Sequence, residues 1–229
     1  PVGAKERRDQ LLSRQAEAGL LVRLGRPAEA ARTLELAVAR DPGNPGFRQA
    51  LGEAALAAGD AAGAVAAFRA GLAIDPTRVA AWSNLGTALA SLGRADEAVA
   101  AYREATRHGP AVPEAWVNLG NLLNRTGDRV AALDAFDRAL ALRPGFGPAA
   151  IGRGIALQGC GRLAEAIAVF DAVLALAPAD PGALNNRAVA LQEAGRLDEA
   201  IAGFRAALAA DPVDPVAHNN LGGALMSAR

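Results

Sequence analysis

The spacing of six prolines constrains the fold of this chain more than any other feature of its sequence. These residues are Pro42, Pro76, Pro110, Pro144, Pro178 and Pro212. A constant period of 34 residues indicates a tandem array of one supersecondary unit, because unrelated segments would not keep one register. When each proline is placed thirty-second in its unit, the predicted repeats span 11–44, 45–78, 79–112, 113–146, 147–180 and 181–214.

The two ends of the chain complete this predicted organisation. Residues 1–10 are expected to form an N-terminal extension or the start of a capping helix, and residues 11–229 a single array. Residues 215–229 make a partial repeat, or a final solvating helix. Because its apolar Leu221 and Leu225 belong to a first helix without a second, we expect the native chain to continue past Arg229.

A glycine occupies the fifteenth place of every complete repeat. These glycines are Gly25, Gly59, Gly93, Gly127, Gly161 and Gly195. Glycine adopts the left-handed backbone conformation without steric cost, so it ends helices and begins tight turns. Each repeat is therefore predicted to contain two antiparallel helices joined by a tight turn, near residues 79–92 and 95–108 in the third repeat.

A small residue and a large one recur at two further places. The eighth place is glycine at Gly52, Gly86, Gly120, Gly154 and Gly222. The twenty-fourth place holds Leu34, Phe68, Tyr102, Phe136, Phe170 and Phe204. Glycine inside a helix costs about 1 kcal/mol relative to alanine, so a steric requirement must offset that cost. We expect the helices of each repeat to pack closely around one large side chain.

Composition narrows the classes of function. Hydrophobic residues make up 52% and charged residues 21% of the chain, which is typical of a folded soluble protein. The formal net charge is zero, and no block carries the basic surplus of a nucleic-acid binder, so no nucleic-acid partner is expected. No apolar run is long enough to span a bilayer, so no membrane insertion is expected. A cytoplasmic location is expected, or a periplasmic one if the chain, which begins with Pro1, is an excised fragment.

Residues able to carry out catalysis are sparse. His108 and His218 lie far apart at different places of the repeat and do not have the spacing of a metal site or a catalytic pair. Cys160 has no neighbouring His or acidic residue and is predicted to be a buried structural thiol. Arg153 and Arg187 replace the usual leucine and are expected to pack their stems in an interface and pair with carboxylates. We therefore predict a protein that is not an enzyme, with no cofactor and no metal.

One repeat carries the residues by which the family is recognised. They are Trp82, Leu85, Gly86, Leu89, Ala98, Tyr102, Ala105 and Pro110. This pattern resembles the tetratricopeptide repeat family, over about residues 11–229. The resemblance implies an all-α fold, a right-handed superhelical solenoid of helix-turn-helix repeats, whose first helices line a concave groove.

The resemblance also indicates which residues face that groove. The sixth place of the repeat is asparagine at Asn84, Asn118, Asn186 and Asn220, interrupted by Gly152. Other polar side chains at groove places are Asn121, Asn124, Arg125, Gln158, Asn185, Gln192 and Asn219, and apolar ones include Ile151 and Ile155. The asparagines are similar to the ladder of the O-linked N-acetylglucosamine transferase repeat domain, which holds an acceptor polypeptide. Alternatively, they complete local hydrogen bonds of the helices.

These residues predict a scaffold that binds an extended segment of a protein partner in its groove. An amide side chain has a donor and an acceptor, so it pairs with the C=O and N–H of an extended peptide. Two alternatives stay open. The chain is the substrate-recognition arm of a larger enzyme, such as a glycosyltransferase that follows it covalently, or it is a structural scaffold that assembles into homo-oligomers.

Overall fold

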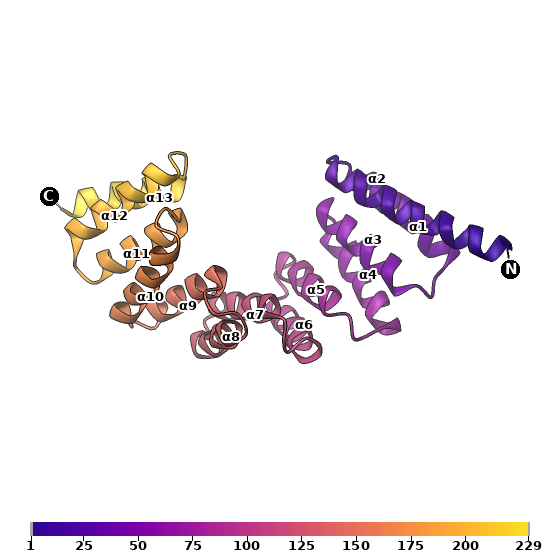
Figure 1. The fold of residues 1–229 in the computed structure, drawn as a ribbon, viewed down its shortest axis with the longest axis horizontal. Coiled ribbons are helices and arrows are strands. Elements are labelled where there is room, and N and C mark those ends of the chain that lie inside the picture. Colours follow the sequence, from indigo (N-terminus) through magenta and orange to yellow (C-terminus); the bar gives the residue numbers. More distant parts are fainter. Residues whose placement is uncertain (1, 229) are drawn as a thin grey trace. The chain divides into compact units, whose positions relative to one another are not determined.

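The computed structural model describes residues 2–228, with side chains from residue 10 to residue 228. The described residues form α-helices joined by short turns and contain no strand (Figure 1). The helices are α1 (Val2–Arg23), α2 (Pro27–Arg40), α3 (Pro45–Ala57), α4 (Ala61–Ile74), α5 (Val79–Ser91), α6 (Ala95–His108), α7 (Pro113–Arg125), α8 (Arg129–Leu142), α9 (Gly147–Gly159), α10 (Leu163–Leu176), α11 (Pro181–Glu193), α12 (Leu197–Ala210) and α13 (Pro215–Ser227). The predicted all-α class is confirmed.

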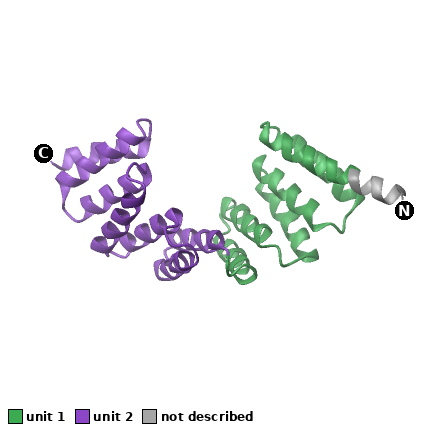
Figure 2. Ribbon diagram, in the orientation of Figure 1, with its two compact units in different colours: residues 1–111 green, residues 112–229 purple. Residues whose placement is uncertain are grey.

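The helices divide into two compact units (Figure 2). Unit 1 comprises residues 1–111, with α1 to α6, and unit 2 comprises residues 112–229, with α7 to α13. Within each unit, helices that follow one another pack together as antiparallel pairs. The helices α3, α5, α7, α9, α11 and α13 begin at the residues where the sequence places the repeat starts. The union of all repeats into one array stays a prediction.

The turn inside each repeat has the predicted geometry. Its glycine has a positive φ in all six cases, which the backbone shows at Gly25, Gly59, Gly93, Gly127, Gly161 and Gly195. A side chain with a Cβ would be strained there, so glycine closes the first helix and lets the chain reverse within two residues. Asn44, Asp180 and Asp214 are N-caps, because their side chains accept hydrogen bonds from backbone N–H groups of the helices that follow them.

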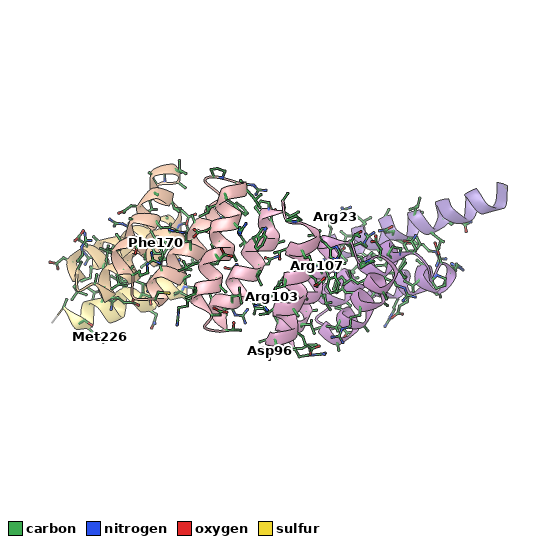
Figure 3. All side chains as sticks on the ribbon, turned by 90° about the horizontal axis from the view of Figure 1, so that it is seen from below. Arg23, Asp96, Arg103, Arg107, Phe170 and Met226 are labelled. Atoms are coloured by element: carbon green, nitrogen blue, oxygen red, sulfur yellow. The ribbon has the colours of Figure 1, made fainter. Side chains whose placement is uncertain are left out.

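In the second to fifth repeats, the large side chain at the twenty-fourth place is packed against the glycine at the eighth. Phe68, Phe136, Phe170 and Phe204 are fully buried. Figure 3 shows Phe170 among the helices of unit 2. A Cβ added to Gly120 would lie 2.8 Å from Cε1 of Phe136, which is closer than real Cβ contacts. The steric requirement expected from the sequence is therefore explained: the aromatic ring packs directly against helix backbone, where only a glycine leaves room for it.

The sixth repeat reaches the same packing with a different pair. Ala188 stands at the eighth place, and Gly203 precedes the buried Phe204 on α12. A Cβ added to Gly203 would lie 2.9 Å from the Cβ of Ala188. In this repeat the residue without a Cβ at the contact thus lies on the second helix instead of the first.

The second helices begin in one of two ways. The side chains of Asp60 and Asp128 accept from backbone N–H groups at the starts of α4 and α8. The other kind of start has an arginine at the N-cap and a glutamate three residues later, as in the Arg94–Glu97 ion pair of 2.7 Å. Hydrogen bonding from the Arg94 guanidinium lowers the pKa of Glu97 below its usual value. This carboxylate also lies near the positive end of the helix dipole.

Two expectations about single side chains have opposite outcomes. Arg153 and Arg187 donate to Asp137 and Asp171 at 2.6 and 2.5 Å, so the predicted pairing of these arginines is confirmed. The predicted burial of Cys160 is wrong, because its thiol is exposed. Cys160 is the C-cap of α9, in the turn before the second helix of its repeat.

Candidate functional site

A cavity of about 320 Å³ lies on the side of unit 2 formed by its first helices. Residues of α7, α9 and α11 supply most of its wall, and the first residue of α8 supplies the rest. The lining residues are Asn124, Arg129, Ile155, Gln158, Gly159, Asn186, Val189 and Glu193. Four residues of the predicted groove are thus brought together: Asn124, Ile155, Gln158 and Asn186.

The polar groups of this cavity differ in how far they are already engaged. The Nε2 of Gln158 donates to Oε1 of Glu193 at 2.8 Å and links α9 to α11. Asn124 and Asn186 are half-buried, and their side-chain amides form no hydrogen bond with the described residues. Each of these two amides therefore presents a donor and an acceptor to whatever enters the cavity.

Arg129 lines the cavity, although the sequence analysis did not single it out. It is the first residue of α8, and its Cδ would lie 2.8 Å from a Cβ added to Gly159. Gly159 therefore leaves room for the arginine stem. The family pattern assigns the groove to first helices, so a residue that opens a second helix was missed. With Glu193 opposite in sign, the formal charges of the lining cancel.

The other predicted residues of unit 2 lie outside this cavity. Asn185 is buried, and its Oδ1 accepts from Nδ2 of Asn220 at 3.1 Å, which joins α11 to α13. Asn121, Arg125 and Asn219 are exposed, whereas Asn118, Ile151 and Gln192 are half-buried.

In unit 1, Asn84 is part of a local polar network. Its Nδ2 donates to Oε1 of Glu53 at 3.2 Å, and Gln49 donates to the same oxygen at 2.8 Å. Arg78 in turn donates to Oε1 of Gln49 at 2.8 Å. The asparagine at this place thus holds α5 to α3 and completes hydrogen bonds within its own unit.

The interruption of the asparagine series at Gly152 has a steric cause. Gly152 is buried, and an added Cβ would lie 2.5 Å from Cζ of the Phe136 ring. The ring fills the space that an asparagine side chain would need to leave the helix.

We expect Gly152→Asn to lower the free energy of unfolding by about 1–3 kcal/mol, the usual cost of overpacking a core. Chemical denaturation monitored by circular dichroism would measure this change. The control is Gly147→Ala at the start of the same helix, where an added Cβ meets nothing within 4 Å. Equal stability of Gly152→Asn and the wild type would show that the ring is not the obstacle.

Within residues 10–228, no group of three or more His, Cys, Asp and Glu side chains is placed to hold a metal ion. None of the described helices is both long and apolar enough to cross a membrane.

Each repeat is a pair of antiparallel helices, with a positive-φ glycine in the turn between them and a large buried side chain packed between the helices. This repeated unit defines a helical tandem-repeat protein. Sequence models of the tetratricopeptide repeat match residues 21–89, 81–145, 151–215 and 187–229. The chain therefore belongs to the tetratricopeptide repeat family. No curated protein sequence matches it.

Solved structures of this family share the fold. A tetratricopeptide repeat protein from Parabacteroides merdae is 18% identical with a TM-score of 0.84, covering 97% of this chain and 87% of its own. PilW, a type IV pilus biogenesis factor, is 21% identical with a TM-score of 0.80, covering 92% and 98%. YrrB, described as a TPR protein with an unusual peptide-binding site, is 21% identical with a TM-score of 0.65, covering 82% and 97%. At these identities the likeness establishes the fold alone.

Proposed function

We propose that this chain is a protein-interaction scaffold and that the cavity of unit 2 binds an extended segment of a partner polypeptide. The observation that carries the proposal is the pair of half-buried amides, Asn124 and Asn186, which line one cavity and are not engaged with the described residues. Bound water satisfies such groups in the free protein, and a peptide backbone offers the same complement of donors and acceptors.

The other lining residues favour a ligand that is recognised by its peptide backbone over one that is recognised by charged side chains. Arg129 and Glu193 contribute opposite charges, so the cavity does not select a strongly charged ligand. Ile155 and Val189 supply an apolar surface, and 38% of Ile155 is exposed to solvent. An apolar side chain of the peptide would cover this surface while its backbone meets the two asparagines.

The family comparison supports the kind of ligand but not its identity. YrrB, with the same fold, is described as having a peptide-binding site. The resemblance to the glycosyltransferase ladder rests on Asn84, Asn118, Asn186 and Asn220. Two of these, Asn84 and Asn220, are engaged in local hydrogen bonds. The same cavity would serve an independent scaffold or the substrate-recognition arm of a larger enzyme, whereas homo-oligomeric assembly would use other surfaces.

Replacing both free amides tests the proposal. Peptides selected from a phage-displayed library on the wild-type chain should bind the Asn124→Ala/Asn186→Ala variant about tenfold or more weakly, because two hydrogen bonds worth about 0.5–1.5 kcal/mol each are lost. Calorimetric titration measures this change. The melting temperature should stay the same, since neither amide forms a hydrogen bond with another described residue.

Asn121→Ala is the matched control, because Asn121 lies on the same helix as Asn124 but is exposed and outside the cavity. Its affinity for the selected peptides should equal that of the wild type. Unchanged affinity of the double variant, or an equal loss in the control, would assign peptide binding to another surface.

A further inference from the structure

A second cavity of unit 2, of about 490 Å³, is apolar and lies between α8, α9 and α10. It shares no lining residue with the 320 Å³ cavity of unit 2 that is proposed to bind a peptide, which we call the candidate peptide site. The residues that shape it are Leu140, Ala150, Arg153, Val173, Leu176 and Asp180. Most of the lining side chains are aliphatic, and Asp137, Arg153 and Asp180 carry the charged groups.

Comparison with other repeats of the same chain shows what this cavity lacks. In three repeats the fourth residue donates a hydrogen bond to the carbonyl oxygen of the proline six residues earlier. The structure shows this bond for Arg48 to Pro42 at 3.1 Å, Trp82 to Pro76 at 2.7 Å and His218 to Pro212 at 3.0 Å. In the fifth repeat the fourth residue is Ala150, which has no side-chain donor for the carbonyl oxygen of Pro144.

The same substitution also leaves an apolar side chain uncovered. In the third repeat, the Trp82 ring stacks on His108 with centroids 6.5 Å apart. The residue equivalent to His108 in the fifth repeat is Leu176, which is 76% exposed although it lines the cavity. Ala150 and Leu176 thus occupy the places in the fifth repeat that the stacked rings of Trp82 and His108 occupy in the third.

The charged lining residues give the cavity a preference for a positively charged ligand. Asp137 is paired with Arg153 at 2.6 Å, so these two charges compensate each other. Asp180 accepts from the backbone N–H of Ala183, and no cation of the described residues forms an ion pair with it. The carboxylate of Asp180 is therefore not compensated by a cation and lies beside apolar lining residues. This arrangement favours a ligand with a positive charge next to its apolar part.

We propose that this cavity binds the side chain of a tryptophan on a partner polypeptide, with a basic residue beside it. The indole ring lies between Ala150 and Leu176, its N–H donates to the carbonyl oxygen of Pro144, and the basic side chain approaches Asp180. The partner thereby supplies the group that Trp82 supplies from within its own repeat. Aromatic side chains seated in such pockets dominate the energetics of many interfaces.

A fluorescein-labelled Gly-Trp-Lys-Gly peptide, followed by fluorescence polarisation, is the probe. Wild-type protein should bind it. The 1-methyltryptophan peptide should bind about fivefold more weakly, because it lacks the N–H donor. A peptide with glutamate in place of lysine should also bind more weakly. Equal affinity of the 1-methyl peptide would overturn the hydrogen bond to Pro144, and undetectable binding of the parent peptide would overturn the site.

Two variants locate the binding. Ala150→Trp should fill the cavity from within, abolish binding and raise the melting temperature, which also shows that it folds. Leu176→Ser should weaken binding about fivefold or more by removing apolar contact. Val130→Ser is its matched control, because Val130 is 78% exposed on α8 and does not line the cavity. Wild-type affinity in both cavity variants, or the same loss in Val130→Ser, would overturn the proposal without bearing on the candidate peptide site.

Discussion

Phe136→Ala is expected to lower the free energy of unfolding by about 3–5 kcal/mol, the usual cost of removing a fully buried aromatic ring. The ring has no exposed surface and fills the space over two buried glycines, Gly120 on α7 and Gly152 on α9. Its loss therefore leaves a void beside Gly120 and Gly152, which have no side chains with which to fill it. Denaturant unfolding followed by circular dichroism would give the change.

The control for this prediction removes the same side chain from a partly solvated place. Phe146 is half-buried, with the guanidinium of Arg143 4.3 Å above its ring centroid. Phe146→Ala should cost less than Phe136→Ala, because its ring is only partly buried and a cation–π contact is worth about 0.5–1 kcal/mol at exposed sites. Equal costs of the two variants would contradict the view that the buried aromatic ring stabilises the repeat.

Gly120→Leu is expected to destabilise the chain by about 1–3 kcal/mol or more, because it overpacks the same contact from the opposite side. Its new side chain begins where the Phe136 ring already lies, 2.8 Å from Cε1. The midpoint of denaturation should fall.

The partial repeat provides a matched control. Gly222 has the same place in α13, but an added Cβ meets nothing within 4 Å. Gly222→Leu should be neutral or slightly stabilising, because glycine is the poorer helix former by about 1 kcal/mol. If both leucine variants unfold at the wild-type midpoint, the steric role assigned to the eighth place is wrong.

The sequence predicts the backbone of each repeat well, because one period repeated six times gives many independent signals. A glycine that recurs at the fifteenth place predicts the turn at Gly127, and a large side chain that recurs at the twenty-fourth place predicts the buried ring of Phe136. The starts of α3 and α5 coincide with predicted repeat starts for the same reason. When a residue type recurs at the same place in six repeats, even a weak local preference for a turn or a helix gives a secure prediction.

Individual side chains of the candidate site could not be predicted equally well, because their contacts depend on neighbouring helices. Nothing near Asn185 in the sequence reveals that Asn220 donates to it from another helix. Arg129 reaches the cavity only because Gly159 leaves space for it. The exposure of Cys160 likewise follows from its place in a turn and not from its residue type.

That exposed thiol makes the central claim testable with the natural partner. Cys160 is the only cysteine of the chain and is adjacent to Gly159, which lines the candidate cavity. A benzophenone attached to Cys160 would therefore cross-link a polypeptide held in the cavity, and mass spectrometry would identify the attached segment. The control carries the label on a Ser91→Cys/Cys160→Ser variant, since Ser91 is exposed on unit 1.

The decisive measurement is the yield of this cross-link, after irradiation in a cell extract, for the wild type and for the Asn124→Ala/Asn186→Ala variant. Binding of an extended segment in the cavity predicts one recurrent segment in the wild type, strongly reduced in the double variant and absent with the label at residue 91. The same segment at equal yield in the double variant, or with the label at residue 91, would contradict peptide binding at this cavity.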